Sequence, residues 1–173
     1  MKALNQFVLA LAPVSRGFGL FVVDMAGKAI DWRVREIRDA NHKNARCQAA
    51  ADQLLDEFRP AVMVIEDHRA PGSRRHSRVQ ELLDLFAELA IAQGVDVVRY
   101  GVREVRASLG LSPRANKHKI AVEVAKRFPA LERRLPKPKR IWETEAHAMA
   151  MFQAGALALT YLGRAQRIGL GSL

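Results

Sequence analysis

The fold is decided by one stretch of sequence, Phe7-Val-Leu-Ala-Leu-Ala-Pro-Val-Ser-Arg-Gly-Phe-Gly-Leu-Phe-Val-Val-Asp24. Two apolar runs of the β type, 7–12 and 18–23, flank a short link. The link contains Pro13, Ser15, Arg16 and Gly17. A link of that length between two strand patterns predicts an antiparallel hairpin. A third strand is predicted over 29–36, so the chain opens with three meandering strands.

Helices and strands alternate along the rest of the sequence. Apolar residues at helical spacing predict helices over 45–58 and 77–93, the second opened by a capping-box pattern. Strands are predicted over 61–65 and 95–100. Three more helices are predicted over 102–109, 116–128 and 143–162, with a basic, proline-rich linker over 129–140. The order β-β-β-α-β-α-β-α-α-α predicts an α/β fold: a mixed five-stranded sheet, three strands antiparallel and two parallel, with helices on both faces.

Length and charge limit the possible classes of protein. A chain of 173 residues predicts one domain, which we place at 1–163, followed by a C-terminal tail at 164–173. The net charge of +10 favours a polyanionic partner, and nucleic acid before a membrane surface. Arginine outnumbers lysine, and arginine is the side chain best suited to bidentate phosphate contacts.

Two absences in the sequence are also informative. Cys47 is the single cysteine, which excludes an intrachain disulfide and a cysteine zinc site. No apolar run approaches the ~18 residues of a membrane-spanning helix. We therefore expect a cytoplasmic protein with no membrane partner.

The segment Leu11-Ala12-Pro13-Val14-Ser15-Arg16-Gly17-Phe18-Gly19 resembles the first motif of RuvC-type Holliday-junction resolvases, within the RNase H-like superfamily. The family pattern is an apolar strand ending in Asp-Pro-Gly, then Ser/Thr-Arg, then a glycine-rich start of the next strand. The match covers Pro13, Ser15, Arg16 and Gly19, whereas Ala12 stands where the family has its metal-binding Asp. The resemblance implies an RNase H-like sheet with the first strand central and the fourth beside it.

The resemblance also implies Mg²⁺-dependent (or Mn²⁺-dependent) cleavage of phosphodiesters by about four acidic or histidine groups. Glu66 matches the acid at the end of the fourth strand. Two registers compete for the acidic pair of the last helix. One places Phe152 and Gly155 at those positions, with Gln153 nearby, and the other supplies Glu145. The candidate catalytic and metal-binding residues are therefore Glu66 and Glu145, with Ala12 at the position of the family Asp.

Basic residues follow the predicted strands and precede the predicted helices. We expect the nucleic acid to be DNA. The candidates for contact with it are Arg16, Arg69, Arg74, Arg75, Arg78, Lys117 and Lys119, and a third basic segment covers 133–140. Family resolvases carry an aromatic wedge after the strand-four acid, where this chain has His68 and Arg69. We therefore expect binding mainly to phosphates, with a strong dependence on salt.

Three functions are compatible with these residues. The favoured one is a RuvC-like nucleic-acid-binding protein whose catalytic site is impaired, a pseudo-nuclease. The second is an active Mg²⁺-dependent, structure-specific DNA endonuclease that either uses Glu66, Asp67 and Glu145 or has had an Asp at position 12 replaced by Ala12 through engineering. The third is an adaptor that binds an acidic protein. The resemblance also implies a homodimer that pairs near the helix after the fourth strand, through Leu82, Leu85, Phe86 and Leu89.

Overall fold

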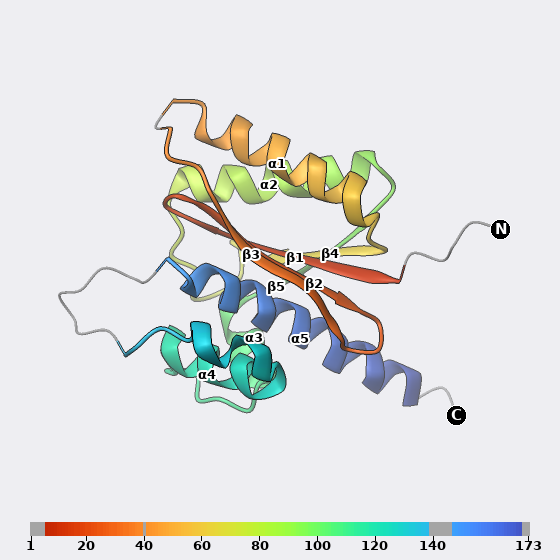
Figure 1. Cartoon of the computed structure of the whole chain (residues 1–173), viewed down its shortest axis with the longest axis vertical. Coiled ribbons are helices and arrows are strands. Elements are labelled where there is room, and N and C mark those ends of the chain that lie inside the picture. The colour runs from red at the N-terminus through yellow and green to blue at the C-terminus, as the bar shows by residue number, and fades with distance from the viewer. Residues whose placement is uncertain (1–5, 40, 139–146, 171–173) are drawn as a thin grey trace.

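The computed structural model describes residues 6–39, 41–138 and 147–170. It contains one five-stranded sheet with the strand order β3-β2-β1-β4-β5, as predicted (Figure 1). The strands are β1 (Phe7–Val14), β2 (Gly17–Asp24), β3 (Ala29–Glu36), β4 (Val62–Glu66) and β5 (Asp96–Tyr100). The first three are antiparallel, and β4 and β5 join in parallel. The central strand is therefore β1, with β4 beside it.

Helices cover both faces of the sheet (Figure 1). One face carries α1 (Lys43–Phe58) and α2 (Ser77–Ala92). The other carries α3 (Val102–Ser108), α4 (Lys117–Arg127), the 3₁₀ helix η1 (Pro129–Arg134) and α5 (Met149–Leu170). Within the described segments, no helix combines the length and apolar character needed to cross a lipid bilayer.

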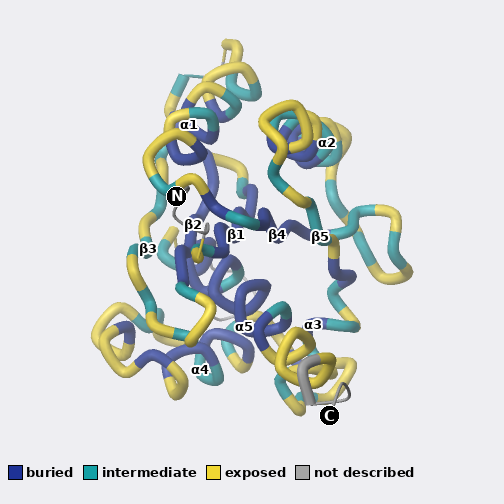
Figure 2. Tube along the Cα trace, turned by 90° about the vertical axis from the view of Figure 1, so that its right-hand side faces the viewer, coloured by how far each residue is buried: buried dark blue, intermediate teal, exposed yellow. Residues whose placement is uncertain are grey.

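The central strand is buried on both faces, which explains its uninterrupted apolar sequence. Successive side chains of a strand point to opposite faces. Val8, Ala10 and Ala12 accordingly join the core beneath α4 and α5, and Leu9 and Leu11 join the core beneath α1 and α2. Figure 2 shows this buried centre, which includes much of α5, while α1 and α2 on the other side of the sheet are more exposed.

The first hairpin is tighter than the sequence predicts. β1 continues through Pro13, which pairs with Phe18, so only Ser15 and Arg16 lie between the strands. Pro13 has no N–H to donate, but β1 pairs with β4 only as far as Ala10. Beyond Ala10 the two parallel strands no longer form a ladder, and proline is therefore tolerated in a central strand.

The last helix is longer than predicted. α5 continues to Leu170, past the predicted end at Leu162, so residues 164–170 of the expected tail are helical. Arg164 lies in this added part of the helix, and its guanidinium forms an ion pair of 2.8 Å with Glu104 of α3. The same guanidinium lies 5.0 Å from the ring centroid of Tyr100, in cation–π geometry. These contacts connect the end of α5 to α3 and β5.

The single cysteine provides a simple test of the core. Cys47 is fully buried in α1, and burial raises the pKa of its thiol. The reactive form is the thiolate, so we expect a chromogenic disulfide reagent to react at least ~100-fold more slowly with the folded protein than with the urea-unfolded chain. Reaction of the folded protein at the rate of a free thiol would contradict this packing.

Candidate functional site

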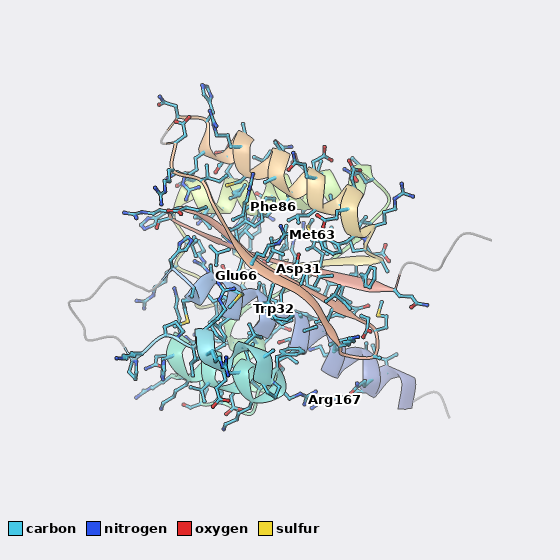
Figure 3. The ribbon with its side chains drawn as sticks, viewed as in Figure 1. Asp31, Trp32, Met63, Glu66, Phe86 and Arg167 are labelled. Atoms are coloured by element: carbon cyan, nitrogen blue, oxygen red, sulfur yellow. The ribbon has the colours of Figure 1, made fainter. Side chains whose placement is uncertain are left out.

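The parallel pairing of β1 with β4 brings positions 12 and 66 to one site, as the sequence predicts. The last registered pair is Ala10 with Val64, and Ala12 and Glu66 each lie two residues further along their strands. Both residues line a cavity of about 320 Å³. Figure 3 shows Glu66 on the α5 side of the sheet, with Met63 and Phe86 on the α1–α2 side.

The Glu66 carboxylate is bound by an arginine. Arg75 Nε donates to Glu66 Oε2 at 2.8 Å, and Arg75 Nη2 donates to Oε1 at 3.3 Å. The two side chains are only 11% and 22% exposed, so solvent screens this pair much less than a surface ion pair. Both oxygens of Glu66 therefore already have a cationic partner in a bidentate arrangement.

The loop that carries Arg75 is fixed at both ends. At its start the Asp67 amide donates to the carbonyl of Tyr100 at 2.9 Å, and Asp67 Oδ1 accepts from the Arg69 amide at 3.0 Å. At its end the Gln80 side chain donates to the Arg75 carbonyl at 2.8 Å. Gln80 therefore holds the loop rather than closing a capping box with Ser77, because the N-cap of α2 is His76.

The last helix contributes no carboxylate to the cavity within its described part. Gln153, Ala156 and Leu157 are the α5 residues in the cavity lining. Phe152 and Gly155, which one of the two registers places at the acidic positions, do not line the cavity. A Cβ at Gly155 would lie 2.8 Å from Val124 Cγ1 of α4, so a side chain has little room there.

The described residues do not fit the pair of divalent metals that the resemblance implies. No group of three or more His, Cys, Asp or Glu side chains in this part of the chain could hold a metal ion. Glu66 is already paired with Arg75, and Asp67 does not line the cavity. The other predicted ligand, Glu145, lies outside the described residues. The described residues therefore supply no set of ligands for a metal-dependent step at this site.

The cavity is instead rich in positive charge. Of the residues predicted to bind nucleic acid, it brings together Arg74, Arg75 and Lys117. It adds Arg106 of α3, which the sequence reasoning missed. Arg106 Nη1 donates to the Pro113 carbonyl at 2.9 Å, so its guanidinium is held close to the start of α4. A lone arginine on a short helix carries no sequence signal of such a role.

The other predicted basic residues do not line the cavity. Arg78 is used within the fold, because its guanidinium donates to Asn44 Oδ1 at 3.0 Å and to the Val14 carbonyl at 3.2 Å. Arg69 is exposed and lies 3.5 Å from Asp84. Arg16, in the β1–β2 turn, and Lys119, in the first turn of α4, are exposed. The third basic segment is described only as far as residue 138.

His68, which follows Glu66 where the family carries its aromatic wedge, is fixed by a contact with α2. His68 Nε2 lies 2.9 Å from Asp84 Oδ1 of α2, and its side chain is 10% exposed. A histidine in that environment cannot insert between DNA bases without breaking its contact with Asp84. The site therefore offers cations at its surface and no free aromatic wedge at this position.

Comparison with solved structures identifies the fold. The chain superposes on Thermus thermophilus RuvC with a TM-score of 0.70 and 23% identity, over 93% of this chain and 96% of that one. A second structure of T. thermophilus RuvC, in complex with a Holliday junction substrate, superposes with a TM-score of 0.69 and 22% identity. The match covers 94% of this chain and 96% of that one. The yeast mitochondrial Holliday junction resolvase Ydc2 superposes with a TM-score of 0.63 and 13% identity, over 94% of this chain and 80% of that one.

These similarities define a protein with the RuvC type of RNase H-like fold. Comparisons with protein-family sequence models and with curated proteins find no match. The strand order and the near-complete coverage of the two RuvC structures agree with the fold that the motif at 11–19 predicts.

Proposed function

We propose that this protein binds DNA, with four-way junctions as the first candidate ligand, and does not hydrolyse it. One observation carries the proposal: at the carboxyl ends of β1 and β4, Ala12 faces a cavity in which Glu66 is already bound by Arg75. A phosphoryl-transfer site depends on metal ions and carboxylates to stabilise charge in the transition state. A guanidinium paired to the remaining carboxylate opposes the binding of such an ion.

Charge and fold support nucleic acid as the partner. The chain carries a net charge of +10, and its cavity is lined by four basic side chains and one acidic one. A structure with the same fold holds a Holliday junction substrate. Phosphate contacts by several cations make binding strongly dependent on salt concentration.

A cleavage assay tests the catalytic part of the proposal. We expect no incision of a labelled four-way junction in Mg²⁺ or Mn²⁺, at protein concentrations that shift the junction fully in a gel. Specific incision by nanomolar protein that is lost in Glu66→Ala would overturn the proposal and support an active endonuclease. Failure to retain any DNA at moderate salt would instead favour the protein adaptor.

We also propose that the protein forms a homodimer through α2. Fewer residues of this helix can contact a second copy than the sequence suggests. Leu82 and Phe86 are fully buried in the core of the single chain, so they are not available for pairing. Leu85 and Leu89 are partly exposed on α2, and Ile91 is 61% exposed. Leu85 and Leu89 lie one turn apart on α2 and are the part of the predicted set on which two copies could meet, whereas Ile91 lies on another face of the helix.

A further inference from the structure

We propose that Arg75 is a built-in phosphate-binding cation, so that the cavity takes a backbone phosphate of DNA without a divalent metal. This inference rests on the proposed DNA-binding function and names the group that performs it. Glu66 then acts as a positioning residue for Arg75. In a metal-dependent site a bound metal cation attracts the DNA phosphate, whereas here the positive charge belongs to a side chain of the protein.

The hydrogen bonds of Arg75 leave donors for a ligand. A guanidinium carries five N–H groups in one plane. Glu66 accepts one from Nε and one from Nη2. The remaining edge, formed by Nη1 and the second hydrogen of Nη2, is itself a two-pronged donor that matches the spacing of two phosphate oxygens. Arg75 lines the cavity, and in this proposal the phosphate binds to that edge from the cavity side.

The Glu66 contact fixes this donor edge before a ligand arrives. A free arginine loses rotamer freedom when it binds, whereas a guanidinium already held by a carboxylate and a loop already held by Gln80 lose less. Glu66 also neutralises part of the positive charge of Arg75. The guanidinium is therefore well oriented for a phosphate but attracts it less strongly than an unpaired arginine would. The remaining attraction comes from Arg74, Arg106 and Lys117, which line the same cavity.

The rest of the lining suits the groups next to a phosphate. Tyr100, Val102, Val105, Ile120 and Leu157 give the cavity apolar walls. Apolar walls lower the local dielectric, which strengthens each contact between a guanidinium and a phosphate. They also offer surface for the sugar or base attached to that phosphate. The chemical class of ligand is therefore a nucleotide unit within a chain, bound through its phosphate.

The test measures junction affinity by fluorescence anisotropy across a salt series, with EDTA or Mg²⁺ at constant ionic strength. We expect the wild-type affinity to be the same in both. Arg75→Ala should weaken binding roughly tenfold or more and lower the salt slope by about one. A matched control is Arg33→Ala, since Arg33 lies on the edge strand β3, two strands from β1, and should leave both quantities unchanged.

A double variant separates phosphate binding from simple charge neutralisation. If Arg75 only cancels the charge of Glu66, then Arg75→Ala/Glu66→Gln should bind the junction as tightly as the wild type. If Arg75 holds a phosphate, the double variant should stay weak, and Arg75→Lys should recover only part of the affinity because it lacks the planar fork. Circular dichroism and thermal melting of each variant show that it is folded.

The outcomes distinguish this inference from the proposed function. No binding of the junction by folded wild-type protein would overturn the proposed function itself. Binding that is unaffected by Arg75→Ala, restored in the double variant or dependent on divalent metal would overturn the inference alone.

Discussion

Replacing Gly19 with alanine is expected to lower the free energy of unfolding by about 3 kcal/mol or more, a large effect for one added methyl group. The reason is the close approach of α5 to β2 at this point. A Cβ at Gly19 would overlap the backbone carbonyl of Ala150. A backbone group cannot rotate away as a flexible side chain can, so α5 would have to move off the sheet.

The measurement is urea denaturation followed by circular dichroism, with Gly163→Ala as the matched control. Gly163 lies in α5, the helix that packs on Gly19, and no atom lies within 4 Å of a Cβ built at Gly163. Alanine favours a helix over glycine by up to ~1 kcal/mol, so the control should be as stable as the wild type or more stable. Equal stabilities for the two variants would contradict the packing of α5 on β2.

Adding carboxylates to the cavity is expected to create a metal site, which the described residues of the wild type do not form. The variant is Ala12→Asp/Arg75→Ala/Gln153→Asp, which places two new carboxylates beside Glu66 in one cavity and removes the competing guanidinium. Three carboxylates repel one another, so this variant should be less stable than the wild type without metal. Mn²⁺ should reverse the loss, adding about 2.7 kcal/mol at a hundred times its dissociation constant.

Thermal melting with and without Mn²⁺, together with calorimetric titration, measures this effect. The control is Ala12→Asp/Gln153→Asp with Arg75 retained, which we expect to bind Mn²⁺ more weakly because the guanidinium competes for Glu66. A wild-type melting temperature that rises with Mn²⁺ would contradict our description of the site. So would a triple variant that folds and shows no response to the metal.

The sheet could be predicted from sequence because its central strands carry strong local signals. The apolar run of β1 and the Val/Ile-rich run of β4 are buried on both faces, and each is bounded by turn residues. The motif at 11–19 then fixed the strand order by resemblance. The end of α5 was missed because Gly163 resembles a helix stop, and the stabilising contacts of Arg164 lie far away in sequence.

The candidate site was predictable only in part, because its contacts are set by three-dimensional geometry. Strand register was enough to bring Ala12 and Glu66 together. The pairing of Arg75 with Glu66 depends on how the loop between them folds back, and no periodicity describes a loop. The choice of Gln153 over Phe152 depends on the rotation of α5 about its axis, since both residues belong to a helix whose first half is buried nearly all round.

The cavity is assembled from parts of the chain that are synthesised at different times. Pro13 belongs to the first hairpin, Glu66 to the middle of the sheet, Lys117 to the start of α4 and Leu157 to the last helix. A growing chain on the ribosome can form the hairpin early, but one wall of the cavity does not exist until α5 emerges. Nascent chains that lack α5 therefore lack one wall of this cavity.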